Sequence, residues 1–465
     1  MTLDELVTSL QESYIGEYRT DKTELPPILL LPSEITVDVF AICVELTDVA
    51  SWKTLQNLSH VCSLWRTLIT QTPQLWMSLS YSWYRCDYGF SKILAEHIVR
   101  SNQSPLSLSL AVTSRDNMRE GIFDVIAPAF HRLRAFHFTD AKFKDLAQLS
   151  QLSRYENIFP LLESLSFSHD ILDEDGDAEH PFDPIILQTP ILHDLTMSDI
   201  PAKFLEVTLA QAKTVTWHDT DYDPNAVKHV LLQCSNAETV DLMLRGWGAT
   251  LRLSSSDSST PAPMTVLPRL KSLFIEITNI EKADASPLFQ SIYTPNLRHL
   301  RVKAEKDIAG WKQHSFVQFA ARSLQNLVVL ELSFSDPTSE MLPAIFAHCP
   351  NVEEFTSNAL HQNVDLVLTS LISSALPRLT KVQILGLSMY ISIEVFKLFL
   401  EDRWTHARRA GHFSRVNELK IECMLMYWAW MNPLRQELDA EASSYREEGM
   451  KIEFGAIYNL EGEHD

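Results

Sequence analysis

Hydrophobic residues follow two different periods along the chain, and the change falls at about residue 130. Before it, apolar residues recur three and four positions apart, as they do on one face of an α-helix. One such stripe runs through Ile35, Val39, Ile42 and Leu46, and Ser33 is placed to cap the helix that it predicts. After the change, short segments alternate apolar and polar residues, which is the pattern of β-strands. We therefore predict a helical N-terminal region followed by a larger region in which strands and helices alternate.

A second helical stripe follows the first and is stopped by Pro73, so we expect two or three short amphipathic helices in this region. It contains Leu55, Leu58, Val61, Cys62, Trp65 and Leu68. Fewer than about 60 residues make a poor hydrophobic core by themselves. Part of this apolar surface is therefore expected to rest on the remainder of the chain or on a partner.

The larger region repeats a unit of the form Pro-x-Leu-x-x-Leu-x-apolar at intervals of roughly 25 to 30 residues. Clear copies begin at Pro160, Pro190, Pro268, Pro295, Pro350 and Pro377, and weaker copies centre on Leu133, Ala212, Ala237, Leu327 and Val416. Each copy contains a short alternating segment, such as residues 165–167, whose apolar side chains face one side and whose polar side chains face the other. Segments with helical spacing lie between the copies, at 225–232 and 340–346. Strands joined through helices are expected to be parallel.

Two α/β architectures alternate strands and helices in this way. Stacked repeats bury a continuous core and present their strands on an extended concave face. A doubly wound α/β enzyme would need glycine-rich turns for phosphates, but the chain has only 12 glycines and no Gly-x-Gly-x-x-Gly. The sequence therefore predicts an α/β solenoid with parallel strands on the concave face. The alternating segment 104–110 is predicted to be the first strand of the array.

Three short motifs stand together in the N-terminal helical region. Leu31-Pro32 begins the first helix, Val61-Cys62-Ser63-Leu64-Trp65-Arg66 lies in the second stripe, and Pro73-Gln74-Leu75-Trp76 follows it. The combination resembles an F-box. The long interval between Pro32 and Val61 resembles the extended F-box-like version common in basidiomycete fungi, and the repeats resemble degenerate leucine-rich repeats. The plainer alternative is an N-terminal helical cap on a larger domain.

The F-box resemblance implies a non-catalytic subunit that recognises substrates for a ubiquitin ligase. The F-box would bind a Skp-type adaptor and, through it, a cullin scaffold, while the repeats would bind an unknown cargo protein. The implied adaptor-binding residues are Leu31, Pro32, Ile35, Val39, Leu58, Val61, Cys62 and Trp65. A leucine-rich-repeat scaffold that takes no part in ubiquitin transfer is the alternative.

These resemblances and patterns divide the chain into four expected segments. They are an N-terminal extension at 1–24, an F-box-like helical domain at 25–80, the solenoid at 81–435, and a C-terminal cap with an acidic tail at 436–465. Proline- and glycine-rich linkers do not separate the second segment from the third. The two are therefore expected to join directly.

The outward strand positions of the repeats form the candidate cargo surface. They are small and polar in the early repeats, whereas the central repeats present a basic cluster beside an aromatic residue: Phe274, His299, Arg301 and Lys303. Such a cluster is suited to grip an acidic or phosphorylated cargo segment through charge-assisted hydrogen bonds. The alternative is a solvated strand face whose charges are balanced by Glu276 and Glu331 on neighbouring strands.

Charge and cysteine content narrow the function classes. Lys and Arg total 39 against 60 Asp and Glu, and the formal net charge of −21 would repel nucleic acids and anionic membranes. The sequence lacks an apolar stretch near the roughly 20 residues that span a bilayer, so we expect a cytoplasmic or nuclear protein. Six cysteines without Cys-x-x-Cys spacing favour reduced, buried thiols over disulfides or zinc ligands.

Other constellations give no clear chemistry. The acidic segment 173–177 lacks the closing glutamate of a calcium loop, and the Ser-rich segment 254–261 reads as a low-complexity loop. His169-Asp170, His193-Asp194 and His218-Asp219 recur at equivalent strand ends. Neither an activated nucleophile nor a converging ligand set accompanies these pairs in the sequence, so we expect no metal and no cofactor. After the ligase subunit and the repeat scaffold, the third hypothesis is a hydrolase that uses His193 or His218.

Overall fold

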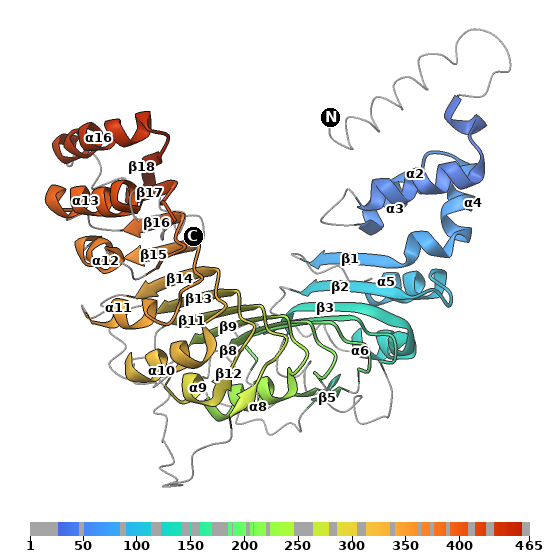
Figure 1. Ribbon diagram of the computed structural model, residues 1–465. Coiled ribbons are helices and arrows are strands. Elements are labelled where there is room, and N and C mark those ends of the chain that lie inside the picture. Colours follow the sequence, from blue (N-terminus) through green and yellow to red (C-terminus); the bar gives the residue numbers. More distant parts are fainter. Residues whose placement is uncertain are drawn as a thin grey trace. The chain divides into compact units, whose positions relative to one another are not determined.

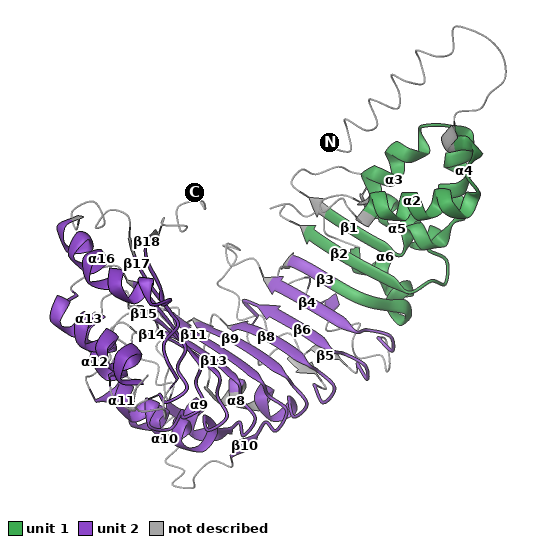
Figure 2. Cartoon of the chain, turned by 45° about the horizontal axis from the view of Figure 1, so that its top comes forward, with its two compact units in different colours: residues 1–136 green, residues 137–465 purple. Residues whose placement is uncertain are grey.

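The structure is a computed structural model of the chain. It describes residues 27–45, 51–83, 90–112, 122–141, 145, 148–149, 159–169, 185–187, 189–200, 205–207, 209–219, 224–245, 264–278, 286–304, 313–334, 340–359, 364–372, 376–386, 391–407, 414–424 and 432–457. The chain forms two compact units, residues 1–136 and 137–465 (Figure 2).

Unit 1 begins with short helices and continues into strands. Its elements are η1 (Pro27–Leu30), α2 (Ser33–Glu45), α3 (Ser51–Ser59), α4 (Ser63–Gln71), η2 (Pro73–Trp76), β1 (Ser78–Trp83), α5 (Phe90–Arg100), β2 (Leu106–Val112), α6 (Ile122–Ile126) and η4 (Ala127–Arg132). The strand β3 (Leu133–Ala141) begins at the end of this unit. Leu55, Trp65, Ile69 and Trp76 form much of the buried helical core, and the Trp76 indole donates to the Ile69 carbonyl at 2.7 Å.

The second helical stripe is divided between α3 and α4, so with α2 the described part of the region has three short α-helices, within the predicted two or three. The chain breaks between α3 and α4, where Cys62 is extended with φ −156° and ψ 171°. The break cannot be read from the spacing, because apolar residues continue through it at helical intervals. Its physical result is that Leu58 and Trp65 are both buried while Val61, in the turn between them, is exposed.

The prediction that the segment 104–110 is the first strand of the array was wrong. That segment does contain a strand, β2, but β1 precedes it and pairs with it in parallel, with Leu79 opposite Leu108. Leu79 and Tyr81 are buried and alternate with less buried serines, as the strand period requires. The pattern is short and follows the aromatic helical region directly, which hid it in the sequence.

Unit 2 is an array of parallel strands (Figure 1). The strands that form its main sheet follow each other in chain order: β4 (Ser164–His169), β6 (Asp194–Ser198), β8 (Thr214–Asp219), β9 (Thr239–Arg245), β11 (Ser272–Thr278), β13 (His299–Ala304), β14 (Val329–Phe334), β15 (Glu354–Ala359), β16 (Lys381–Gly386), β17 (Glu418–Met424) and β18 (Lys451–Ile457). Two small parallel pairs accompany them, β5 (Ile185–Leu187) with β7 (Leu205–Val207) and β10 (Thr265–Val266) with β12 (Ile292–Tyr293).

Helices connect the later strands and lie on one side of the sheet of unit 2 (Figure 1). They are α8 (Pro224–Gln233), α9 (Ser286–Ser291), α10 (Gln313–Ser323), α11 (Met341–Phe346), α12 (Val364–Leu371), α13 (Ile393–Leu400), the π-helical turn η6 (Glu401–His406) and α16 (Asn432–Glu447). Phe289 of α9 packs on Phe316 of α10 with ring centroids 4.9 Å apart, so adjacent connections share one core.

The strands of the repeats are in register, and each contributes one buried apolar side chain to the same row. This row runs through Leu165, Leu195, Val215, Val240, Leu273, Leu300, Leu330, Phe355, Val382, Leu419 and Ile452. The predicted α/β solenoid with parallel strands is confirmed, and every predicted copy of the repeat coincides with a strand. The strand β18 was missed because it follows a long charged helix and departs from the Pro-x-Leu pattern.

Asparagines in the turns before the strands tie neighbouring repeats together. Asn296 Nδ2 donates to the Pro268 carbonyl at 2.7 Å, and Asn326 Nδ2 donates to the Pro295 carbonyl at 2.9 Å. Asn351 Nδ2 repeats the contact on Gln325 at 2.6 Å. Each side chain satisfies a turn carbonyl that the strand ladder leaves unused.

Candidate functional site

The helix α2 is apolar on two faces, and one of them points to solvent. Thr36, Phe40 and Val44 are buried against the rest of unit 1. The stripe that the sequence analysis identified is exposed instead: Ile35 is 48% exposed, Val39 37% and Ile42 54%. Since large apolar side chains gain by leaving water, a row of three on one helix face indicates a docking surface.

Other predicted adaptor-binding residues extend this exposed set. Leu31 is 41% exposed, Val61 is 43% exposed, and Pro32 is exposed as well. We call Leu31, Pro32, Ile35, Val39 and Val61 the adaptor surface. Leu64 of α4, which is 48% exposed, and Ile42 also lie on the surface, although neither was predicted as a site residue. Their exposure, which the helical period alone does not show, is the signal that adds them.

The remaining predicted residues lie inside unit 1. Leu58 and Trp65 are buried, and Cys62 is partly buried in the turn before α4. The Trp65 ring packs edge-to-face on Phe40 with centroids 4.9 Å apart. Thr36 Oγ1 donates to the Pro32 carbonyl at 3.1 Å, which holds the start of α2 in place. These residues support the exposed stripe, and their direct contact with a partner stays a prediction.

The predicted basic cluster lies on the outward strand positions of β11, β13 and β14. Phe274 and Arg301 are opposite each other in the register, and Arg301 is opposite Glu331. His299 Nε2 lies 2.8 Å from Glu331 Oε1, Arg301 Nε lies 3.5 Å from Glu331 Oε2, and Lys303 Nζ lies 2.7 Å from Glu276 Oε1. The Phe274 ring stands edge-on to His299 with centroids 4.8 Å apart. All four predicted residues are therefore brought together, with both glutamates in contact.

The glutamates set the electrostatics of the cluster. The hydrogen bond from His299, followed by the charges of His299 and Arg301, lowers the pKa of Glu331 against the effect of burial. On β9, the strand beside β11, burial raises the pKa of Asp241, while His218 and Arg301 oppose the rise. Asp241 lies opposite Phe274 and was not assigned by the sequence analysis, although its place in the strand pattern is outward. Arg301, with 58% of its side chain exposed, is the most accessible cation of the cluster.

Residues 28–82 match the F-box-like family. This segment contains the whole adaptor surface. The match covers a small part of the chain and does not reach the strands of unit 2. No curated protein sequence matches the chain.

Among solved structures, the chain is similar to one described as "Crystal structure of TLR13-ssRNA13 complex". The identity is 12%, the TM-score is 0.28, and the match covers 62% of this chain and 45% of that chain. The match thus spans less than half the length of that protein.

Within the described residues, the histidine–aspartate pairs at the strand ends do not form a catalytic or metal-binding arrangement. His218 lies 3.3 Å from Ser198 through Nδ1 and Oγ, and His193 is half-buried. Asp170, the partner in the first pair, lies outside the described residues. Within the described ranges, His, Cys, Asp and Glu side chains do not gather in groups of three that could hold a metal ion. The calcium-like segment 173–177 and the loop 254–261 lie outside the described residues.

A lipid bilayer requires a long, apolar helix to cross it, and none of the helices that the structure describes meets that requirement.

Proposed function

We propose that this chain is the substrate-recognition subunit of a Skp–cullin–F-box type ubiquitin ligase. The observation that carries the proposal is the exposed apolar stripe Ile35, Val39 and Ile42 within the segment that matches the F-box-like family. Fully burying an exposed side chain of this kind is worth about 1.5–3 kcal/mol, and these three are 37–54% exposed, so each can gain roughly half of that on a partner. The stripe is therefore sufficient to anchor an adaptor helix or groove.

In this role the chain is not an enzyme. It binds a Skp-type adaptor through the adaptor surface, reaches the cullin scaffold through that adaptor, and presents cargo from the repeats. Its contribution to ubiquitin transfer is a raised effective concentration of cargo near the catalytic partners. The proposal includes the cytoplasm or nucleus as its location, and an extended F-box-like segment of the basidiomycete type, which rests on the long interval between Pro32 and Val61.

The outward strand face of unit 2 is the proposed cargo side, with Phe274, His299, Arg301 and Lys303 at its centre. The exposure of Arg301 and its long 3.5 Å contact with Glu331 support this, because an incoming carboxylate or phosphate can compete for the guanidinium. The same proposal divides the chain into an N-terminal extension, an F-box-like domain, the solenoid and a C-terminal cap, with boundaries after residues 24, 80 and 435.

The second candidate is a repeat scaffold that binds a partner without ubiquitin transfer. The ion pairs that Glu276 and Glu331 make with the basic cluster favour it, since they balance the strand face without any ligand. In that case the helices of unit 1 would serve as an N-terminal cap.

Co-expression with a fungal Skp-type adaptor, followed by size-exclusion chromatography, tests the proposal. The unmodified chain should co-elute with the adaptor, and the Leu31→Asp, Ile35→Asp double variant should not. Leu398→Asp is the matched control, because Leu398 is also apolar, helical and 55% exposed but lies in unit 2. Failure of the folded, unmodified chain to bind, beside an F-box protein that does bind, would reject the ligase role and favour the scaffold.

A further inference from the structure

A groove of about 1200 Å³ runs along the turns that precede strands β9 to β16 of unit 2. We call it the edge groove, and its lining includes Arg269, Lys271, Arg298, Asn326, Asn351 and Arg378. These side chains come from successive turns of the solenoid. The lining therefore repeats at the spacing of neighbouring parallel strands, roughly 4.8 Å.

The edge groove is positive although the chain has a formal charge of −21. Four cations line it, Arg269, Lys271, Arg298 and Arg378, against the two carboxylates Glu238 and Glu353. Lys271 Nζ lies 2.6 Å from Glu238 Oε2. Arg269, Arg298 and Arg378 are exposed, and within the described part of the chain none of the three forms an ion pair. Three guanidiniums thus remain available for an anionic ligand.

Amide side chains line the groove in the turn of Arg298 and in the next two turns toward Arg378. Asn296, Asn326 and Asn351 each donate one hydrogen to a carbonyl of the preceding turn. A carboxamide has two N–H donors and an acceptor oxygen, so each retains one donor and its oxygen. Donors and acceptors repeated along a line are what an extended peptide backbone requires.

The positions of Arg298 and Arg378 define a peptide register. Arg298 lies one residue before β13, and Arg378 lies three residues before β16, three strands further on. The two residues are therefore separated by roughly 14 Å across the strands and roughly 7 Å along them, and their long side chains accommodate the offset. In an extended peptide, side chains four residues apart point the same way and lie roughly 13 Å apart. We propose that the edge groove binds an extended peptide segment with two acidic side chains four residues apart, one on Arg298 and one on Arg378. Peptide binding in this groove does not depend on the proposed function; only the identification of the peptide as part of a ligase cargo does.

The lining favours a peptide over a nucleic acid. Glu353 lies in the turn before β15, between the turns of the two arginines. A continuous row of phosphates would meet this carboxylate, whereas a peptide can place a neutral residue there. The net charge of the chain opposes a polyanion as well.

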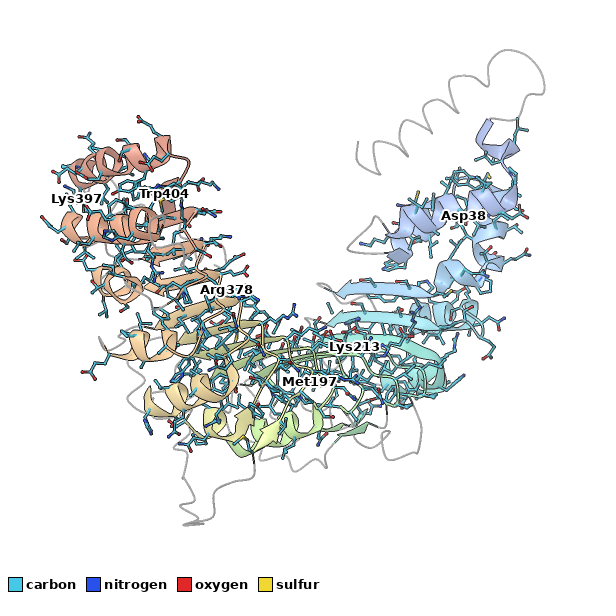
Figure 3. All side chains as sticks on the ribbon, viewed as in Figure 1. Asp38, Met197, Lys213, Arg378, Lys397 and Trp404 are labelled. Carbon is cyan, nitrogen blue, oxygen red and sulfur yellow. The ribbon has the colours of Figure 1, made fainter. Side chains whose placement is uncertain are left out.

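Fluorescence anisotropy on the full chain tests the inference with a labelled peptide of nine residues, Gly-Ser-Glu-Thr-Ser-Thr-Glu-Ser-Gly. Arg298→Glu and Arg378→Glu should each weaken binding about tenfold or more, since each removes a charge-assisted hydrogen bond and adds a repelling carboxylate. Lys213→Glu is the matched control, because Lys213 occupies the corresponding turn before β8, outside the groove lining, and makes the same change in charge. Figure 3 labels both Lys213 and Arg378.

Three results would overturn the inference. They are equal affinity of wild type and both arginine variants, equal weakening by Lys213→Glu, and equal binding of a peptide in which the two glutamates are adjacent. Displacement of the peptide by single-stranded oligouridylate at lower concentration than by unlabelled peptide would assign the groove to nucleic acid instead. Thermal unfolding of each variant checks that folding is intact. Adaptor binding, measured on the same samples, separates failure of this site from failure of the ligase role.

Discussion

The Phe40 ring of α2 meets the Trp65 ring of α4 edge-to-face, with centroids 4.9 Å apart and planes inclined by 67°. Both side chains are buried. The buried residues of α2 and its exposed stripe differ in direction by roughly 130° around the helix, at 100° per residue. This contact therefore fastens one face of α2 while Ile35, Val39 and Ile42 remain accessible.

Truncation of the contact should destabilise unit 1 without touching the docking surface itself. Trp65→Ala and Phe40→Ala are each expected to lower the free energy of unfolding by about 3–5 kcal/mol, because each leaves a cavity in a small core. Chemical denaturation measures the loss, with Ile35→Asp as the exposed control that keeps the wild-type midpoint. A Trp65→Ala variant of unchanged stability that fails to bind the adaptor would instead show direct contact by Trp65.

Removal of the basic cluster should weaken capture of acidic cargo while adaptor binding is preserved. For Arg301→Glu with Lys303→Glu, we expect at least about a tenfold loss of affinity for phosphoserine peptides, measured by anisotropy. The neutral pair Arg301→Gln with Lys303→Gln should show a smaller loss in the same direction, and it avoids placing new carboxylates beside Glu331. Unchanged affinity in both double variants would remove this cluster from the cargo surface.

Glu331 should make stability depend on pH in the acidic range. Its pKa is lowered in the folded state, chiefly by the hydrogen bond from His299. The unfolded carboxyl binds protons first, so the stabilisation is present above an unfolded pKa of about 4.3 and is lost as pH falls through the lower folded value. Wild type should exceed Glu331→Gln by about 1 kcal/mol at neutral pH, and the difference should vanish in acid. A difference independent of pH in urea titrations would contradict this.

His97 should have a separate effect at milder pH. It is buried beside Tyr81 and 4.7 Å from the Trp76 ring, and burial, with a smaller contribution from Arg100, lowers its pKa to about 4. The unfolded imidazole, with a pKa of about 6.5, takes up its proton first, so stability should fall by about 3 kcal/mol between pH 6.5 and pH 4. His97→Gln should flatten this slope in unfolding measurements. Identical slopes would show that His97 does not titrate in this way.

The asparagine contacts between turns should be worth a modest amount each. Asn351→Ala removes the 2.6 Å donation to the Gln325 carbonyl, and we expect a loss of about 0.5–1.5 kcal/mol in unfolding free energy. Gln325→Ala keeps the acceptor, which is a backbone carbonyl, and serves as the control. If both changes cost the same, the side-chain hydrogen bond has no measurable role.

Sequence periodicity determined the larger part of the fold. Leu165, Leu273 and Leu330 could be placed in the core from order alone, because a strand that buries one face needs apolar residues at every second position. Repetition of the unit then required stacking, since a single copy cannot bury its own apolar face. The motifs around Leu31 and Trp65 also sufficed to predict a helical region of the F-box-like kind, and the match over residues 28–82 confirms that segment.

Only the tertiary structure decided which apolar residues face water and which charges meet. In α2 the stripes of Ile35 and Phe40 are both apolar, so helical spacing cannot tell the exposed face from the packed one. The pairing of His299 with Glu331 and the meeting of Arg298 and Arg378 in one groove depend on how the strands of separate repeats pack side by side. A local pattern fixes the direction of a side chain relative to its own backbone, whereas its neighbours are set by the packing of the whole array.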